Sequence, residues 1–185
     1  MGRVILAGIA GGFAMYVMMS ILHMSPVAQI GFSQMTDDGP ALAALQAGTE
    51  NKPGLYIYPT VDMSSKDAMA KAAAVRKVKP SGIFIYRQPG APGMTPKLLI
   101  TEFLVEVVQS LIAAALLSVA MLATYWGRVG FVTTVGVVSA ITTNVSYWNW
   151  YAFPANYTLA NMGIAVAVFF AAGLAIAALL KPRAS

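Results

Sequence analysis

The chain has 185 residues, of which 58% are hydrophobic and only 10% are charged, and its mean hydropathy is +0.68. Because an ordinary soluble domain carries roughly 25% charged residues, this composition indicates an integral membrane protein. The absence of cysteine excludes disulfides, thiolate metal sites and a cysteine nucleophile. The formal net charge of +5 comes from scattered basic residues without a nucleic-acid-binding motif, so we expect no nucleic-acid partner.

Four apolar stretches are long enough to cross a bilayer, which takes about 20 predominantly apolar residues. They are Val4 to Met24, Leu98 to Leu122, Val129 to Tyr147, and Leu159 to Leu180. The sequence therefore predicts an all-α integral membrane protein, a bundle of four transmembrane helices with a small α+β insert between the first and second. The start of the first stretch is also typical of a secretory signal, but we expect this helix to be retained.

Basic residues in the short segments predict how the helices are oriented. They lie before the first helix, between the second and third, and after the fourth, namely Arg3, Arg128, Lys181 and Arg183. These positions share one side of the bundle, and the positive-inside rule makes that side cytoplasmic. We therefore expect both termini in the cytoplasm and the insert, residues 25–97, outside it.

The insert is predicted to contain two short helices and two short strands. The stretch GPALAALQAG predicts a helix with proline at its start and Gly48 at its end, and SSKDAMAKAAAVRK predicts a second helix capped by Ser64 or Ser65. LYIYP and GIFIYR predict strands, whose pairing can be parallel or antiparallel. Such a small insert has little core of its own, so we expect it to lean on the membrane surface or on a partner.

Aromatic residues concentrate where the helices should meet the membrane surface, which Trp and Tyr favour. The predicted interfacial belt consists of Tyr125, Trp126, Tyr147, Trp148, Trp150, Tyr151, Phe153 and Tyr157. Pro154 supplies the break between the third and fourth helices. The alternatives are a ligand-binding platform built from Trp148, Trp150 and Tyr151, or a contact with a partner subunit.

Each predicted helix also carries polar side chains toward the outer leaflet. They are His23, Glu102, Glu106, Gln109, Asn144, Asn149 and Asn161. Counted at about 1.5 Å per residue from the basic ends of the helices, these side chains fall at similar depths. One interpretation is structural, with carboxylates solvated or paired to Lys97 and amides joining helices. The other is a small cavity in which Glu106 and His23 exchange protons or hold a cation.

Small residues indicate close helix packing, either inside one bundle or between subunits. Gly8 and Gly12 form a GxxxG pair on the first helix. The fourth helix carries a stripe of small residues, Gly163, Ala167, Ala171 and Ala175.

Methionines in and just after the first helix suggest Cu(I), because thioethers suit this ion. They are Met15, Met18, Met19 and Met24. Since they do not share one helical face, we interpret them as packing residues and expect neither a metal nor another cofactor.

Three motifs and the last helix carry a resemblance to a known family. The motifs are PGLYIYP (53–59), TYWGRVGFV (124–132) and YWNWYAFPANYT (147–158), and the Ala/Gly-rich last helix ends in LLKP. In these features the chain resembles a family of uncharacterised bacterial four-helix inner-membrane proteins. The resemblance implies a small multi-pass protein of the bacterial inner membrane with a periplasmic insert. It brings no established activity and therefore assigns no site residue.

No GxSxG, HExxH, P-loop or dinucleotide-binding motif occurs, so we expect no enzyme. The insert, the small-residue faces and the aromatic belt all offer contact surface. We therefore expect an accessory or structural subunit of a larger membrane complex, with the lipid bilayer and other membrane-protein subunits or a second copy as partners. The alternatives are an ion- or proton-handling protein that uses the polar residues, and a membrane-tethered binding module for a periplasmic ligand.

Overall fold

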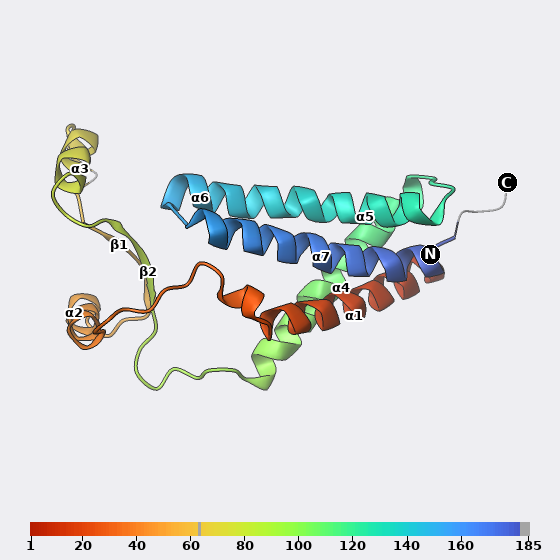
Figure 1. The fold of residues 1–185 in the computed structure, drawn as a ribbon, viewed down its shortest axis with the longest axis horizontal. Coiled ribbons are helices and arrows are strands. Elements are labelled where there is room, and N and C mark those ends of the chain that lie inside the picture. Colours follow the sequence, from red (N-terminus) through yellow and green to blue (C-terminus); the bar gives the residue numbers. More distant parts are fainter. Residues whose placement is uncertain (63, 182–185) are drawn as a thin grey trace. The chain divides into compact units, whose positions relative to one another are not determined.

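Four helices of the protein are long and apolar enough to cross a membrane, as the sequence predicts. The computed structural model describes residues 1–62 and 64–181, so Arg183 lies outside the described residues. The four helices are α1 (Gly2–His23), α4 (Pro96–Val119), a continuous helix over residues 125–151, and α7 (Ala155–Leu179). Figure 1 shows them as one group of helices that also includes both the first residue and the end of α7.

The third of these helices is longer than predicted at both ends. It consists of α5 (Tyr125–Ala140), a π-helical segment η2 (Ile141–Val145) and α6 (Ser146–Tyr151). The Thr124 side chain starts it by accepting a hydrogen bond from the Gly127 amide, at 3.0 Å. A prediction from apolar length does not include such polar helix starts, and it also leaves out the polar and aromatic residues of α6.

The bundle packs through two central helices. α1 packs against both α4 and α7, and α7 also packs against α5, whereas α4 and α5 contact each other much less. The buried core residues of this unit come from all four helices and include Ala7, Met15, Ala113, Ala114, Val132, Val168, Phe169, Ala172 and Ile176. The side of the bundle between α4 and α5 is therefore the less closely packed one.

The GxxxG pair of α1 packs inside the bundle, against α4. A Cβ added to Gly12 would lie 2.5 Å from the Cα of Val107, and one added to Gly8 would lie 2.8 Å from the Cα of Leu111. Such distances exclude any side chain unless a backbone moves. These two glycines therefore allow the helices to approach to backbone contact.

The small-residue stripe of α7 lies beside its buried face and not on it. A Cβ on Gly163 would meet nothing within 4 Å, and the three alanines of the stripe are only half-buried. The buried face of α7 instead carries Val168, Ala172 and Ile176. The stripe is thus not needed for packing within this bundle.

Two side chains at the start of α5 fix it to the end of α7. Arg128 is 7% exposed and donates hydrogen bonds to the carbonyls of Ala123, at 2.9 Å, and Ala177, at 3.2 Å. The Tyr125 hydroxyl donates to the carbonyl of Leu174, at 3.1 Å. Arg128 therefore has a structural role in addition to its place in the charge pattern, because it joins the turn before α5 to the Ala177 carbonyl in the last turn of α7, where carbonyls lack intrahelical partners.

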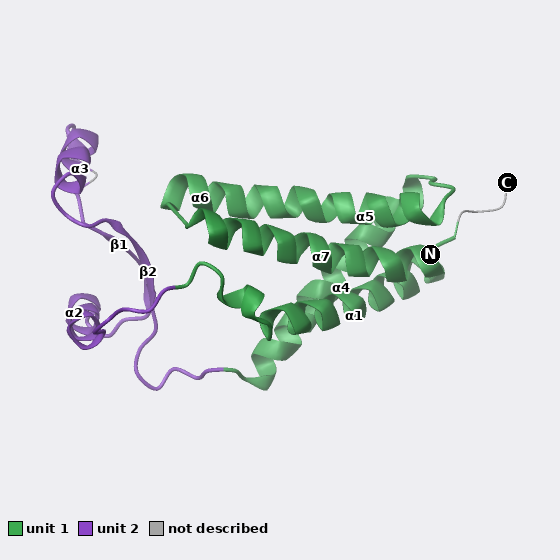
Figure 2. Cartoon of the chain, viewed as in Figure 1, with its two compact units in different colours: residues 1–32, 94–185 green, residues 33–93 purple. Residues whose placement is uncertain are grey.

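The insert forms a second compact unit, Ser33–Gly93 (Figure 2). A short 3₁₀ helix, η1 (Pro26–Gln29), follows α1 and belongs to the first unit. The insert contains α2 (Gly39–Thr49), β1 (Gly54–Tyr58), α3 (Ala68–Arg76) and β2 (Gly82–Tyr86). The two strands pair antiparallel, with Gly54 opposite Tyr86 and Tyr58 opposite Gly82. This register resolves the pairing that the sequence leaves open.

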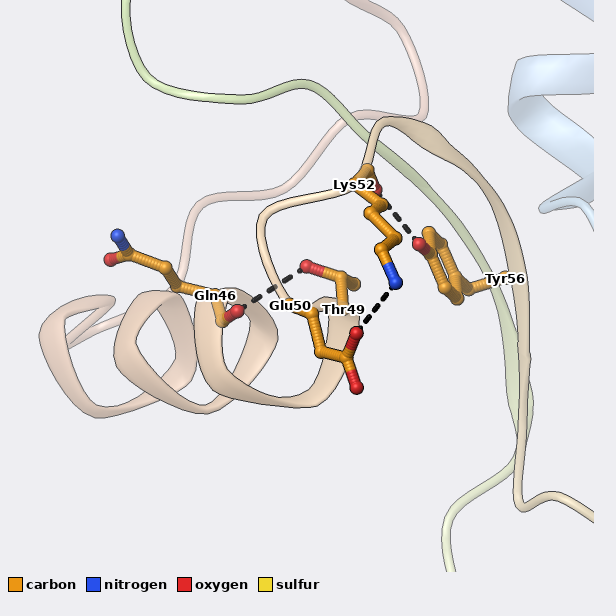
Figure 3. A network of polar contacts seen from close by, with 5 residues as sticks. All are labelled: Gln46, Thr49, Glu50, Lys52 and Tyr56. Atoms are coloured by element: carbon orange, nitrogen blue, oxygen red, sulfur yellow. Dashed lines mark hydrogen bonds and ion pairs between the residues drawn. The ribbon is translucent and has the colours of Figure 1, made fainter.

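The end of α2 differs from the prediction, because Gly48 lies inside the helix. The helix continues to Thr49, and Glu50 ends it with a left-handed φ of 52°. Figure 3 shows how the following turn is held: Lys52 pairs with the Glu50 carboxylate at 2.6 Å, and its carbonyl accepts from the Tyr56 hydroxyl at 2.7 Å. These local bonds stabilise a non-glycine residue in the position where glycine is usual.

The N-cap predicted for α3 is also wrong. The helix starts at Ala68 after Asp67, so neither Ser64 nor Ser65 caps it. Ser64 instead donates through its amide, at 2.9 Å, and its hydroxyl, at 2.6 Å, to the Asp62 carboxylate. These bonds lower the pKa of Asp62 and use Ser64 in a turn that precedes the helix.

The α1–α4 contact predicts a difference between two matched substitutions. Gly12→Ala should lower the stability of the protein by about 1–3 kcal/mol, because the new methyl group overlaps α4. Gly163→Ala adds the same group in open space and should change stability by less than about 1 kcal/mol. Thermal unfolding in detergent measures both. Equal effects of the two substitutions would show that the helices do not touch at Gly12.

The Arg128 hydrogen bonds predict a second contrast. Arg128→Ala should destabilise the protein by roughly 1.5–3 kcal/mol, because bonds to a charged donor are lost. Arg3→Ala, which removes an exposed arginine, should stay within about 0.5 kcal/mol of the unchanged protein. Unfolding in denaturant compares them, and a harmless Arg128→Ala would contradict the structural role.

Candidate functional site

A cavity of about 210 Å³ lies among the four long helices, between α4 and the α5–η2 junction. Its polar lining residues are Glu102, Glu106, Gln109, Ser139, Thr143 and Asn144. Apolar side chains on its other walls include Met19 of α1 and Val168 and Phe169 of α7. The cavity therefore combines an acidic, hydrogen-bonding side with a hydrocarbon side.

Glu106 is the most unusual residue of the cavity. Its side chain is only 1% exposed, and its Oε2 atom has no hydrogen-bond partner among the described residues. The one ion pair among these residues joins Lys52 to Glu50, so the predicted pairing with Lys97 is not found there. A buried carboxylate without a partner is costly, and such a group in a membrane helix marks a candidate site.

Glu102 lies one helical turn before Glu106 on α4 and lines the same cavity, but it is exposed. Residues four positions apart on a helix share a face. The two carboxylates therefore form an acidic strip that runs from the surface of α4 into the buried part of the cavity.

The opposite wall is built where the third helix changes from α- to π-helical geometry. Thr143 and Asn144 belong to the π segment, and Ser139 lies just before it. The Asn144 amide nitrogen donates to the Ala140 carbonyl at 2.9 Å, which leaves its oxygen available as an acceptor. π-helical turns often occur at functional sites because the extra residue redirects side chains.

One further turn along α4, Ser110 extends the polar strip. It is fully buried, and its hydroxyl has no hydrogen-bond partner among the described residues. Gly11 of α1 leaves room for it, since a Cβ at this glycine would overlap the Ser110 hydroxyl. The i, i+4 spacing from Glu106 could have identified Ser110 in the sequence, but a lone serine in an apolar helix carries a weak signal.

The structure brings four of the seven predicted polar residues to the cavity, and the other three are not among its lining residues. His23 is exposed, with its Nδ1 atom 3.1 Å from the Met19 carbonyl. The Asn161 amide nitrogen donates to the Tyr157 carbonyl at 2.9 Å, and Asn149 is exposed. Of the predicted polar residues, only those of α4 and of the η2 segment therefore meet in this cavity.

The aromatic belt divides into packed and outward-facing rings. Tyr147 stacks on Phe153 with ring centroids 5.4 Å apart, and Phe153 contacts Tyr157 at 5.3 Å. Trp148 and Trp150 are 50% and 77% exposed. The packed rings hold the turn between the third helix and α7, whereas the two tryptophans are free to contact the membrane interface or a partner.

The other belt residues are arranged similarly. Tyr125 and Trp126 make an edge-to-face contact at 5.2 Å at the start of α5, where Trp126 is exposed. Tyr151 contacts Tyr147 edge to face at 5.9 Å and is half exposed.

The methionines of α1 serve in packing. Met15 is fully buried, and Met18 and Met19 pack against the core. Among the described residues, no group of three or more His, Asp or Glu side chains is placed to hold a metal ion. Met24, just after α1, is 88% exposed, so the interpretation as a packing residue is wrong for this methionine.

Comparison with protein-family models, with curated proteins and with solved structures gives no match to this chain. Its function is therefore argued from its own residues.

Proposed function

We propose that the chain is a multi-pass protein of the bacterial inner membrane that acts as an accessory subunit and binds another protein through its insert. The observation that carries this proposal is the insert's lack of a core. Among its described residues, 33–62 and 64–93, only Thr49, Ala68 and Ala72 are buried. A unit with so little buried apolar surface gains little free energy from folding alone, and a partner surface would supply the missing burial.

The two-stranded sheet offers the surface for this contact. Side chains alternate between the two faces of a strand. In the observed register Tyr56 lies opposite Phe84, and their rings stack at 5.3 Å. The hydroxyl groups of Tyr56 and Tyr86 bond to the turn after α2. The aromatic face is therefore occupied within the insert.

The other face is aliphatic and uncovered. Leu55 pairs with Ile85 across the strands, and Ile57 pairs with Ile83. Leu55, Ile57 and Ile85 are 69%, 62% and 78% exposed. Because an isolated pair of strands is only marginally stable in water, an apolar partner surface on this face would stabilise the whole insert.

The membrane part of the proposal rests on the outer surface of the bundle. Many large exposed side chains of the four long helices are apolar and suit lipid, among them Ile5, Phe13, Val108, Ile112 and Val138. Arg3 and Lys181 are exposed and Arg128 lies at the start of α5, near the end of α7. This charge distribution supports cytoplasmic termini and a periplasmic insert.

An ion- or proton-handling role is the second candidate, and the cavity around Glu106 supports it. Ion flux through liposomes that contain the purified chain alone would favour this role over that of an accessory subunit.

Cysteine labelling tests the proposed orientation, and the chain provides a cysteine-free background. Ser81→Cys in the insert should react with a membrane-impermeant maleimide in intact cells. Ala123→Cys, between α4 and α5, should react only after the membrane is opened. Labelling of Ala123→Cys alone in intact cells would reverse the orientation.

A double substitution tests the insert surface. Leu55→Asp with Ile85→Asp should remove any protein that co-purifies with the chain after gentle solubilisation, measured by sizing and mass spectrometry. Membrane insertion should not change. Val78→Asp is the matched control, because Val78 is 80% exposed but lies outside the sheet. A chain that purifies without another protein, or whose partner survives the double substitution, would contradict the proposal.

A further inference from the structure

We propose that the cavity beside Glu106 binds a primary ammonium group, carried by a small amine or by an aminophospholipid headgroup. This site goes beyond the accessory role, because it belongs to the helical bundle and does not depend on the insert.

The charge of the cavity favours a cation. Glu102 and Glu106 both line it, and neither forms an ion pair with a described residue. Glu106 is only 1% exposed, and its Oε2 atom accepts no hydrogen bond from the described residues. A bound cation would supply the charge and the donors that this carboxylate lacks.

The cavity also carries a surplus of hydrogen-bond acceptors. An ammonium group has three N–H donors and no acceptor. The cavity offers carboxylate oxygens on α4 and the amide oxygen of Asn144. The amide nitrogen of Asn144 already donates to the Ala140 carbonyl. The Thr143 hydroxyl can also accept. Hydrogen bonds from a cation to such oxygens are among the stronger ones in proteins.

The size and the apolar wall of the cavity favour an organic cation. Its volume of about 210 Å³ equals roughly seven water molecules at about 30 Å³ each, more than a bare metal ion needs. Met19, Val168 and Phe169 face the acidic side. Hydrocarbon attached to an ammonium group would pack against this apolar wall, and an aromatic ring attracts a nearby cation. A hydrated metal ion would instead place water against the apolar wall.

The cavity can be reached from the surface of the bundle. The cavity lies where α4 and α5 make few contacts, and its lining includes the exposed residues Glu102, Ser139 and Thr143. The acidic strip thus leads from the exposed Glu102 to the buried Glu106.

The test uses the full chain, purified in detergent without aminophospholipids, and titrates it with n-butylammonium chloride at neutral pH in a calorimeter. We expect saturable binding, while n-butanol, which lacks the charge, should not bind. Glu106→Gln should weaken the affinity by at least about tenfold, because the charge-assisted hydrogen bond is lost. Asn161→Ala is the control and should bind normally, since Asn161 does not line the cavity.

A second variant keeps the test decisive if Glu106→Gln does not fold. Ala165→Leu fills the cavity without changing its charge and should also abolish n-butylammonium binding. Native mass spectrometry from lipid nanodiscs then separates the two sources of the ammonium group. Retention of phosphatidylethanolamine that is lost in both variants indicates a headgroup, whereas binding of n-butylammonium without such retention indicates a free amine.

Three results would overturn the proposal. The first is that the wild-type chain binds neither n-butylammonium nor phosphatidylethanolamine. The second is that both substituted chains bind these ligands as tightly as the wild type. The third is that sodium or calcium ions bind in a Glu106-dependent way while n-butylammonium does not, which would identify a metal-ion site.

Discussion

The backbone contact between α1 and α4 at Gly8 and Gly12 is the constraint on which the rest of the bundle depends. Val107 and Leu111, which touch these glycines, alternate along α4 with Glu106 and Ser110. Once α4 is fixed against α1 at this distance, Glu106 must lie inside the bundle and Ser110 must lie against Gly11. The close approach of two helices therefore determines both the packing of the core and the position of the acidic group.

In a membrane, polar groups need partners within the protein because lipid supplies none. Most polar side chains of this bundle obey this constraint by binding backbone carbonyls. Arg128 and Tyr125 bind carbonyls of α7, while Asn144 and Asn161 bind carbonyls of their own helices. Glu106 and Ser110 differ from them, because the Glu106 Oε2 atom and the Ser110 hydroxyl have no hydrogen-bond partner among the described residues. This contrast separates side chains that join helices from the buried polar strip of α4.

Apolar length was sufficient to predict the four long helices, because it depends on composition alone. Helix ends depend on single hydrogen bonds, so the Thr124 cap and the Asp62–Ser64 turn escaped a pattern based on hydropathy. The predicted end of α2 at Gly48 is wrong because the residue with left-handed φ is Glu50. The polar residues of α4 were found by their spacing. Their neighbours Ser139 and Thr143 were not, since their place beside α4 depends on how the helices pack and not on spacing within one helix.

The π segment Ile141–Val145 also sets the rotational phase of the residues that follow it. One added residue turns the remainder of an α-helix by about 100° around its axis. With this turn in place, the Tyr147 ring stacks on Phe153, and the Trp148 and Trp150 side chains are exposed. Without the extra residue, every side chain from Ser146 onward would be turned by about 100° relative to the rest of the bundle. The π segment thus influences which aromatic rings pack within the protein and which are exposed.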